Sequence, residues 1–449
     1  MDENVLPSKL LNTLFKAADC IRGHDFIHVF SHNDADGVSA AGILACMLNR
    51  LGKEFQVTIV PILNDSVFAD MQASLGDCIL MSDIGASYID KLEEFEKDVI
   101  VLDHHRTDFE GNGIIYANPH LYGIDGMTSG CGSTLALLLA VTMDENNWDL
   151  VQIAFAGIAG DRQHIEGLKG LNTVLIDEAE KRGYVTRLEG SLVPLGQLSN
   201  ALFVTTDPYI RGVSGSVPAV QTLLEEARVP NDKAYKDLTE EEHWRLSSLI
   251  AIKLLKQGVS VRTLEEVART RYFLKDWNID AEALADIMNA CGRSDQGGLG
   301  IGMCLGDPNC IETAGQENRQ TKNDIVEAVV NLDNRGLSSM ENIQFFDNME
   351  KGYTGLLCGI AMQYIGDPNK PTIGVGTTDD NAKVSSRANW QLLDRGLDLS
   401  VAMKDAAESV GGRGGGHRIA AGGSFPKDRE TAFLMNLNRI VGEQLSGAR

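Results

Sequence analysis

Several features that define other classes of protein are missing from this sequence. Its eight cysteines include no Cys-x-x-Cys pair, which argues against a zinc knot and favours reduced thiols over disulfides. The first residues lack the basic segment of a signal peptide, and the apolar run at residues 131–143 is too short to cross a bilayer. We therefore expect a cytoplasmic protein that does not associate with membranes.

Net positive charge is missing as well. The chain has 63 acidic and 40 basic residues, a formal charge of −23, which argues against binding nucleic acid or membranes through its overall charge. A local basic groove is still compatible with this composition. The 449 residues, 43% of them apolar, suffice for several hydrophobic cores and predict about two to four domains.

The first part of the chain alternates strand patterns with helix patterns. Buried strands are predicted at residues 26–30, 54–61, 77–81 and 98–102. Helical periodicity occupies residues 8–21, 38–51, 130–143 and 149–160. Strands that alternate with helices predict a mostly parallel sheet with right-handed crossovers.

Residues that can bind metal ions follow three of these strands and one helix. They are His32, Asp34 and Asp36 after the first strand, Asp83 after the third, Asp103, His104 and His105 after the fourth, and Asp161 after the last helix. Because the carboxyl ends of parallel strands lie along one edge of a sheet, we expect these side chains to meet there. Titratable groups at the end of a buried strand cost free energy unless they find partners, and carboxylate with imidazole is a typical ligand set for a divalent metal.

The candidate ligands are too many for a single ion. A mixed carboxylate and imidazole set of this size suits two divalent ions, Mn²⁺ first and Mg²⁺ or Zn²⁺ as alternatives, with Asp83 as the bridge for two-metal phosphoester hydrolysis. If His105 is not itself a ligand, we expect it to contact the phosphoryl oxygen or the leaving group. Asp36 and Asp103 either take part in catalysis or only orient the imidazoles and the turn. Asp161 could also be an ordinary helix end.

The sequence changes character after about residue 190. Residues 195–209 are loop-rich and residues 238–257 have the pattern of an amphipathic helix, so residues 191–335 are predicted to form a separate, mostly helical region. From about residue 336 strand and helix patterns return. Strands are predicted at residues 356–364, 372–377 and 382–388, and a helix at residues 399–409.

Residues 411–418 read Gly-Gly-Arg-Gly-Gly-Gly-His-Arg. Such a density of glycine lets the backbone approach a ligand closely and present consecutive N–H groups to an anion, so a phosphate is the expected guest. A flexible loop is the alternative, although strand-like order resumes at residues 419–425. Basic residues gather in this part of an otherwise acidic chain, namely Lys383, Arg387, Arg395, Lys404, Arg413 and Arg418.

These motifs together resemble those of a known family. The runs at residues 32–37, 82–83, 103–105 and 157–161 resemble the four successive motifs of the DHH phosphoesterase superfamily. Residues 411–417 resemble the Gly-Gly-Gly-His signature of its DHH-associated C-terminal domain. Within the superfamily, residues 159–163, 205–212 and 289–293 look like those of archaeal RecJ-like nucleases, a group that includes the GINS-associated nuclease.

The resemblance implies a fold and a set of site residues. The expected fold is α/β: a DHH catalytic domain with a mostly parallel sheet at residues 1–190, the helical region at 191–335, and a smaller α/β C-terminal domain at 336–449 across a cleft. The residues at the family's metal-binding positions are His32, Asp34, Asp83, His104 and Asp161. The first of these is usually Asp in bacterial RecJ, so His32 could shift the metal preference. The residues expected to contact substrate phosphates are Arg387, Arg413, Gly415, Gly416 and His417.

The resulting functional hypothesis is a Mn²⁺-dependent exonuclease that releases mononucleotides from single-stranded DNA or RNA during replication or repair. Two alternatives are a phosphodiesterase for short oligonucleotides and a scaffold of the replicative helicase complex that binds GINS with little catalysis. The acidic stretch at residues 237–242 with Trp244 is a candidate partner surface, although charge runs are usually solvated faces. The polarity of digestion and the choice between DNA and RNA stay open.

Overall fold

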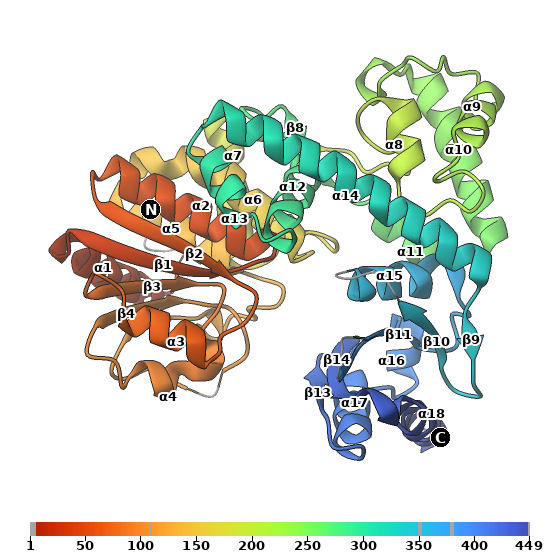
Figure 1. Cartoon of the computed structure of the whole chain (residues 1–449). Coiled ribbons are helices and arrows are strands. Elements are labelled where there is room, and N and C mark those ends of the chain that lie inside the picture. Colours follow the sequence, from red (N-terminus) through yellow and green to blue (C-terminus); the bar gives the residue numbers. More distant parts are fainter. Residues whose placement is uncertain (1–5, 108, 349–352, 378–380, 448–449) are drawn as a thin grey trace. The chain divides into compact units, whose positions relative to one another are not determined.

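The computed structural model describes residues 6–107, 109–348, 353–377 and 381–447 (Figure 1). The chain divides into two compact units. Unit 1 contains Met1–Gly190 and Arg269–Gln320, and unit 2 contains Ser191–Ala268 and Thr321–Arg449. The chain passes from unit 1 to unit 2 for the second time within the long helix α14 (Pro308–Arg335).

Unit 1 is built on a five-stranded sheet in the order β2-β1-β3-β4-β5, and every pairing in it is parallel. Its strands are β1 (Phe26–His32), β2 (Glu54–Val60), β3 (Cys78–Ser82), β4 (Asp98–Leu102) and β5 (Ile115–Ala117). The register pairs Ser31 with Ser82 and Ser82 with Leu102, so β1, β3 and β4 end at nearly the same level. The predicted parallel sheet is confirmed, with β5 as an additional edge strand.

Helices cover both faces of this sheet (Figure 1). On one face lie α1 (Ser8–Gly23), α2 (Ala35–Arg50) and α5 (Gly132–Met143), with α6 (Val151–Gly160) packed against α2 and α5. On the other face lie α3 (Asp65–Gln72) and α4 (Ile89–Leu92). Strand residues therefore contribute alternately to two apolar layers, as expected for a strand buried on both sides.

Residues 269–320 return to unit 1 after an excursion through unit 2. These residues supply two strands of a small antiparallel sheet, β7 (Arg271–Leu274) and β8 (Ile279–Asp280). The third strand, β6 (Val185–Leu188), comes from the end of the N-terminal segment and pairs with β7. The helices α12 (Ala281–Arg293) and α13 (Gly297–Cys304) then pack on α2. The sequence assigned these residues to the intervening region, and the three-part domain division stays a prediction.

Unit 2 begins with helices. They are α8 (Leu198–Val204), α9 (Val217–Glu226), α10 (Glu240–Gln257) and α11 (Val261–Val267). The preceding helix, α7 (Leu171–Arg182), belongs to unit 1. The predicted amphipathic helix at 238–257 is confirmed as α10, which begins with a capping box at Thr239 and Glu242. The loop-rich prediction for residues 195–209 is wrong in part, because α8 forms there and buries Leu198 and Leu202.

The rest of unit 2 is a six-stranded mixed sheet in the order β13-β14-β12-β11-β10-β9. Its strands are β9 (Ser338–Ser339), β10 (Gln344–Asn348), β11 (Thr372–Thr377), β12 (Asn381–Arg387), β13 (Arg413–Gly416) and β14 (Ala420–Pro426). Its helices are α15 (Thr354–Ile360), continued by a π-helical turn (Ala361–Ile365), α16 (Trp390–Asp394), α17 (Leu399–Glu408) and α18 (Glu430–Gly447). The strand predicted at residues 356–364 is wrong: α15 lies against β11 and β12, and the Cys358 thiol donates to the Thr372 carbonyl at 2.9 Å.

Candidate active site

The first motif joins β1 to α2 at the edge of the parallel sheet. Asp34 is the N-cap of α2, where its carboxylate accepts a hydrogen bond from the Gly37 amide at 3.0 Å. His32 Nδ1 lies 2.9 Å from Asp34 Oδ2. Burial alone lowers the pKa of His32, but the carboxylates of Asp34 and Asp83 outweigh it and raise this pKa to about 11. The helix start and the histidine are therefore parts of one anionic turn.

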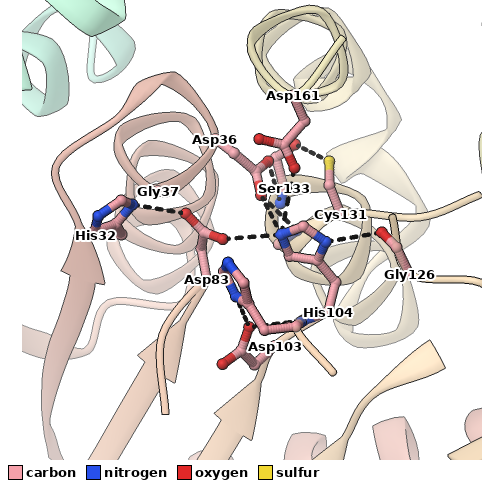
Figure 2. A network of polar contacts seen from close by, with 12 residues as sticks. His32, Asp36, Gly37, Asp83, Asp103, His104, Gly126, Cys131, Ser133 and Asp161 are labelled. Carbon is pink, nitrogen blue, oxygen red and sulfur yellow. Dashed lines mark hydrogen bonds and ion pairs between the residues drawn. The ribbon is translucent and has the colours of Figure 1, made fainter. Parts of the chain in front are cut away.

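Asp83 follows β3 and is buried, with 2% of its surface exposed. Its Oδ1 lies 3.2 Å from His104 Nε2 and its Oδ2 lies 3.5 Å from His32 Nδ1, so the carboxylate stands between two imidazoles (Figure 2). Its backbone φ of 57° is in the left-handed region, which a side chain other than glycine adopts at a cost. This strained conformation occurs at the residue that the sequence predicted to bridge two metal ions.

His104 is oriented by a backbone carbonyl. Its Nδ1 lies 2.8 Å from the Gly126 oxygen, which can only accept, so Nδ1 carries a hydrogen. Its Nε2 faces Asp83 and, at 3.3 Å, Asp161 Oδ2 at the end of α6. Burial lowers the pKa of His104, but the charges of Asp161 and Asp83 outweigh it and raise this pKa well above its usual value. An Nε2 aimed at carboxylates suits a ligand that shares a cation with them.

Asp36 and Asp103 are buried carboxylates whose oxygens are already engaged. Asp36 accepts from the amides of Gly132 at 2.6 Å and Ser133 at 2.9 Å, the first residues of α5 (Figure 2). Asp103 accepts from the Ala86 amide at 2.7 Å and from the amides that follow it in the chain. These contacts fit the alternative in which both residues hold their neighbours in place.

His105 is half-exposed and is held from one side. Its Nδ1 lies 2.7 Å from Asp103 Oδ1, and its side chain is 48% exposed. Burial lowers the pKa of His105, but the hydrogen bond and charge of Asp103 outweigh it and raise this pKa. A protonated imidazole with one edge fixed can donate to an anionic substrate from its other edge.

The residues present fit a pair of divalent cations. None of the described residues donates a hydrogen bond to the buried Asp83 Oδ2, although His32 Nδ1 lies 3.5 Å away as an ion-pair partner, so a lone pair of this oxygen is available to a cation. Burial, together with the charges of Asp34 and Asp36, raises the pKa of Asp83 to about 7. Two groups of donor atoms, each within 4.8 Å, share this carboxylate: one with His32 and Asp34, the other with Asp103, His104 and His105.

Two residues support the site without having been assigned a role from the sequence. Gln163 donates to the Gly126 carbonyl at 2.9 Å and so stabilises the group that orients His104. Asn289 Oδ1 accepts from the Ala35 amide at 3.0 Å, in the first turn of α2. Both stand in stretches that carry the family resemblance, which was the only signal for them in the sequence.

The predicted phosphate contacts lie in unit 2, on and beside β13. Arg413, Gly415 and Gly416 belong to this strand, and His417 follows it. In the register, Arg413 and Lys383 both pair with Ser424, so these two cations flank one residue of β14. They line a shallow depression floored by glycines of β13 and β14.

Arg387 lies at the opposite end of β12 from Lys383. It pairs with Ala420, next to the residue that pairs with Gly416. Its Nη1 donates to the Ser386 carbonyl at 2.9 Å. The structure therefore places the candidate phosphate contacts at both ends of the β12-β14-β13 ladder.

Comparison with known proteins identifies both parts of the chain. Residues 26–158 match the family described as DHH family, N-terminal domain, and residues 343–443 match the DHHA1 domain. The uncharacterized protein MJ0831 of Methanocaldococcus jannaschii is 32% identical over 431 residues, 94% of each chain. No helix in the described part of the chain is both long and apolar enough to span a bilayer.

Two solved structures share the fold across nearly the whole chain. RecJ from Thermus thermophilus, in complex with Mn²⁺, superposes with a TM-score of 0.62 at 17% identity, over 98% of this chain and 55% of that one. The present chain therefore spans just over half the length of that RecJ. CDC45 from Entamoeba histolytica gives a TM-score of 0.64 at 12% identity, over 97% of this chain and 99% of that one.

Proposed function

Because the chain belongs to the DHH phosphoesterase superfamily and has a RecJ-like fold, we propose that it is a metal-dependent exonuclease that releases mononucleotides from single-stranded nucleic acid. The observation that carries this proposal is the position of Asp83: a buried carboxylate, one oxygen of which accepts no hydrogen bond from the described residues, shared by two groups of donor atoms at the carboxyl edge of the sheet. Such an arrangement is what two-metal hydrolysis of phosphodiesters requires of a protein.

The residues that would hold two divalent ions are His32, Asp34, Asp83, His104 and Asp161. Mn²⁺ is the first candidate and Mg²⁺ the second, since the set combines carboxylates with imidazoles and the Thermus RecJ carries Mn²⁺. When bound, such ions supply Lewis-acid polarisation of the phosphoryl group and an activated water.

The chain's own residues would position the substrate and complete the site. Asp103 fixes the ring of His105 at 2.7 Å, so that the exposed edge of this ring can donate to a non-bridging phosphoryl oxygen or to the leaving group. Asp36 anchors the start of α5 and is a positioning residue. On the β12-β14-β13 ladder, Arg413, Arg387 and His417 would grip phosphates of the strand, while Gly415 and Gly416 leave room for close approach.

The test is product analysis on end-labelled DNA and RNA single strands with Mn²⁺ and with Mg²⁺. We expect stepwise release of mononucleotides by the wild type, none after chelation, and none from Asp83→Asn or His104→Gln. The matched control is Asp90→Asn, which removes an exposed carboxylate from α4 and should keep full activity. Wild-type protein that releases nothing from either strand would contradict the proposal. The labelled end also gives the polarity and the preference between DNA and RNA.

The same assay separates a phosphodiesterase for short oligonucleotides from an enzyme for long strands. Comparing kcat/KM for a dinucleotide with that for a long oligomer measures how much the contacts beyond the reacting phosphate contribute. An exonuclease that uses the β12-β14-β13 ladder should prefer the oligomer. Equal values for both substrates would favour the short-oligonucleotide enzyme.

A second proposed role is binding to GINS or another replication or repair protein. The observation that favours it is Trp244, an aromatic side chain 69% exposed on α10 beside the acidic start of that helix. Co-purification with GINS that is lost in Trp244→Ala would support this role, and it can coexist with catalysis. If GINS fails to bind the wild-type protein, GINS is not its partner.

A further inference from the structure

A second group of metal-binding side chains lies at the amino ends of the strands in unit 1. Cys20 stands in the last turn of α1 and His24 is the residue that caps it, four positions later. Cys78 is the first residue of β3, and its register partner in β4 is Asp98, the first residue of that strand. Three elements thus bring two thiols, an imidazole and a carboxylate to one place.

The donor atoms of this group are close enough to share an ion. One ligand atom each from Cys20, His24 and Cys78 lie within 4.8 Å of one another. His24 Nε2 lies 3.2 Å from Asp98 Oδ2, so the carboxylate adjoins the cluster. The His24–Asp98 distance is that of an ordinary ion pair, and the bound of 4.8 Å on the other three atoms is compatible with ligands around a common centre at about 2.0–2.3 Å from each.

The orientation of His24 is fixed in the way seen around metal sites. Its Nδ1 lies 2.9 Å from the Cys20 carbonyl oxygen, which only accepts, so Nδ1 is the protonated nitrogen. The turn itself is held by Lys53, whose ammonium donates to the carbonyls of Arg22 at 3.0 Å and His24 at 2.7 Å. The imidazole is therefore pre-oriented with Nε2 as the available ligand atom.

The cluster is graded from interior to surface. Cys78 is fully buried, Cys20 is partly buried, and the side chains of His24 and Asp98 are 22% and 65% exposed. An ion could enter from the solvent side while its thiolate ligands stay protected.

We propose that Cys20, His24 and Cys78, with Asp98 or water as the fourth ligand, form a binding site for a zinc-type divalent ion. Two sulfurs and one nitrogen select Zn²⁺ over Mn²⁺ and Mg²⁺, which prefer the oxygen-rich set at the opposite edge of the same sheet. The ion would cross-link the end of α1 to β3 and β4 and so stabilise the amino end of the sheet. The two sites of unit 1 would then sort metals by ligand type.

The test is titration of the reduced full-length protein with Co²⁺ and then Zn²⁺. We expect an absorption band from thiolate-to-Co²⁺ charge transfer, displaced by Zn²⁺, and its loss in Cys20→Ser and in Cys78→Ser. The matched control is Cys310→Ser, which changes a partly buried cysteine outside the cluster and should keep the band. His24→Gln changes a more exposed residue and should weaken Zn²⁺ affinity at least about tenfold without affecting the fold.

Three results would overturn the proposal. The first is a reduced wild-type protein without a thiolate band. The second is a band that persists in Cys20→Ser, because it would then come from another cysteine. The third is a purified protein that carries a Cys20–Cys78 disulfide and binds no Co²⁺ after reduction. Because the readout is the thiolate band and not nuclease activity, these outcomes are independent of the proposed function.

Discussion

The edge of the parallel sheet, which would bind the metal ions, and the β12-β14-β13 ladder, which would bind the strand, differ in how their functional groups are exposed to solvent. At the sheet edge, Asp36, Asp83 and His104 are 0%, 2% and 3% exposed, and each is oriented by groups from other elements. On the ladder, Arg413 is exposed and glycines form the floor. A buried, pre-oriented set suits small ions whose geometry must be fixed, whereas an open backbone surface with exposed cations suits a long polymer.

This difference separates the kinetic constants that each region should control. Groups that act at the reacting phosphate change kcat, and groups that bind the strand elsewhere change KM when they contribute equally before and during the reaction. Substitutions at the sheet edge should therefore lower turnover, and substitutions on the ladder should weaken substrate binding. Substitutions that hold unit 1 together should change stability first.

The largest effect is expected for Asp83→Asn. The change keeps the shape of the side chain but removes the charge that two donor groups share, and loss of several kcal/mol of transition-state stabilisation lowers kcat by roughly a thousandfold or more. Stability should not fall, because the variant no longer buries this carboxylate beside Asp34 and Asp36. Steady-state kinetics with thermal unfolding of the same samples measures both. A variant with normal kcat would remove Asp83 from the active site.

The next effect is expected for Asp36→Ala, and it should fall on stability. The substitution leaves the amides of Gly132 and Ser133 without an acceptor at the start of α5. Two charge-assisted hydrogen bonds to buried amides, less the relief of repulsion within the cluster, predict a loss of about 3 kcal/mol. Denaturant unfolding measures it, and hydrogen exchange should localise the loss to α2 and α5. Unchanged stability with abolished activity would instead make Asp36 a catalytic group.

The sheet and its edge could be predicted from the sequence because their signals are local. Each apolar strand ends in polar residues, and a parallel sheet places all such ends on one side whatever the details of packing. The register shows that β1, β3 and β4 are neighbours. Asp83 and His104 could be expected to lie close together even without this strand order. The same reasoning found the candidate ligands, but it could not separate the carboxylates that are available to a metal from Asp36 and Asp103, which accept hydrogen bonds from backbone amides.

The remaining features depend on contacts between distant parts of the chain. Asn289 reaches Ala35 across 254 positions, and Asp36 reaches Gly132 across 96, and no local pattern records such pairs. Residues 356–364 form helix instead of strand because a short apolar run fits either structure until packing decides. The Cys20–Cys78 proximity is of the same kind, since it follows from the placement of α1 on the sheet.

One acid-sensitive group of unit 1 is His28, which lies on β1 four positions before His32. Its ring contacts Ser74 and Thr58. Burial and then the charge of Lys97 lower the pKa of His28 to about 4, although Asp70 opposes them. The unfolded chain, with a pKa near 6.5, binds more protons between these values. The contribution of His28 to stability should therefore fall as pH decreases from about 6.5 towards 4, by up to about 2 kcal/mol at pH 5.

The variant His28→Asn should flatten this dependence. Unfolding midpoints at pH 7 and pH 5 give the slope for wild type and variant. Hydrogen exchange should place the acid effect in β1 and β2, which belong to unit 1. Neither histidine in the described part of unit 2, His243 or His417, is buried. The amides in the sheet of that unit should therefore stay protected from hydrogen exchange when the pH is lowered from 7 to 5. Equal slopes for both proteins would show that other groups govern the acid response.

The smallest effect is expected for Arg413→Ala on the ladder. Removing one exposed phosphate contact should raise KM for a long single strand about tenfold and leave kcat unchanged, with a weaker dependence on salt. The matched control is Arg429→Ala, whose side chain is 61% exposed in unit 2 outside the strands. A fall in kcat at unchanged KM would place Arg413 at the reacting phosphate. It would contradict the assignment of kcat to the sheet edge and of KM to the ladder. A change of the same size in the control would make the effect one of general charge.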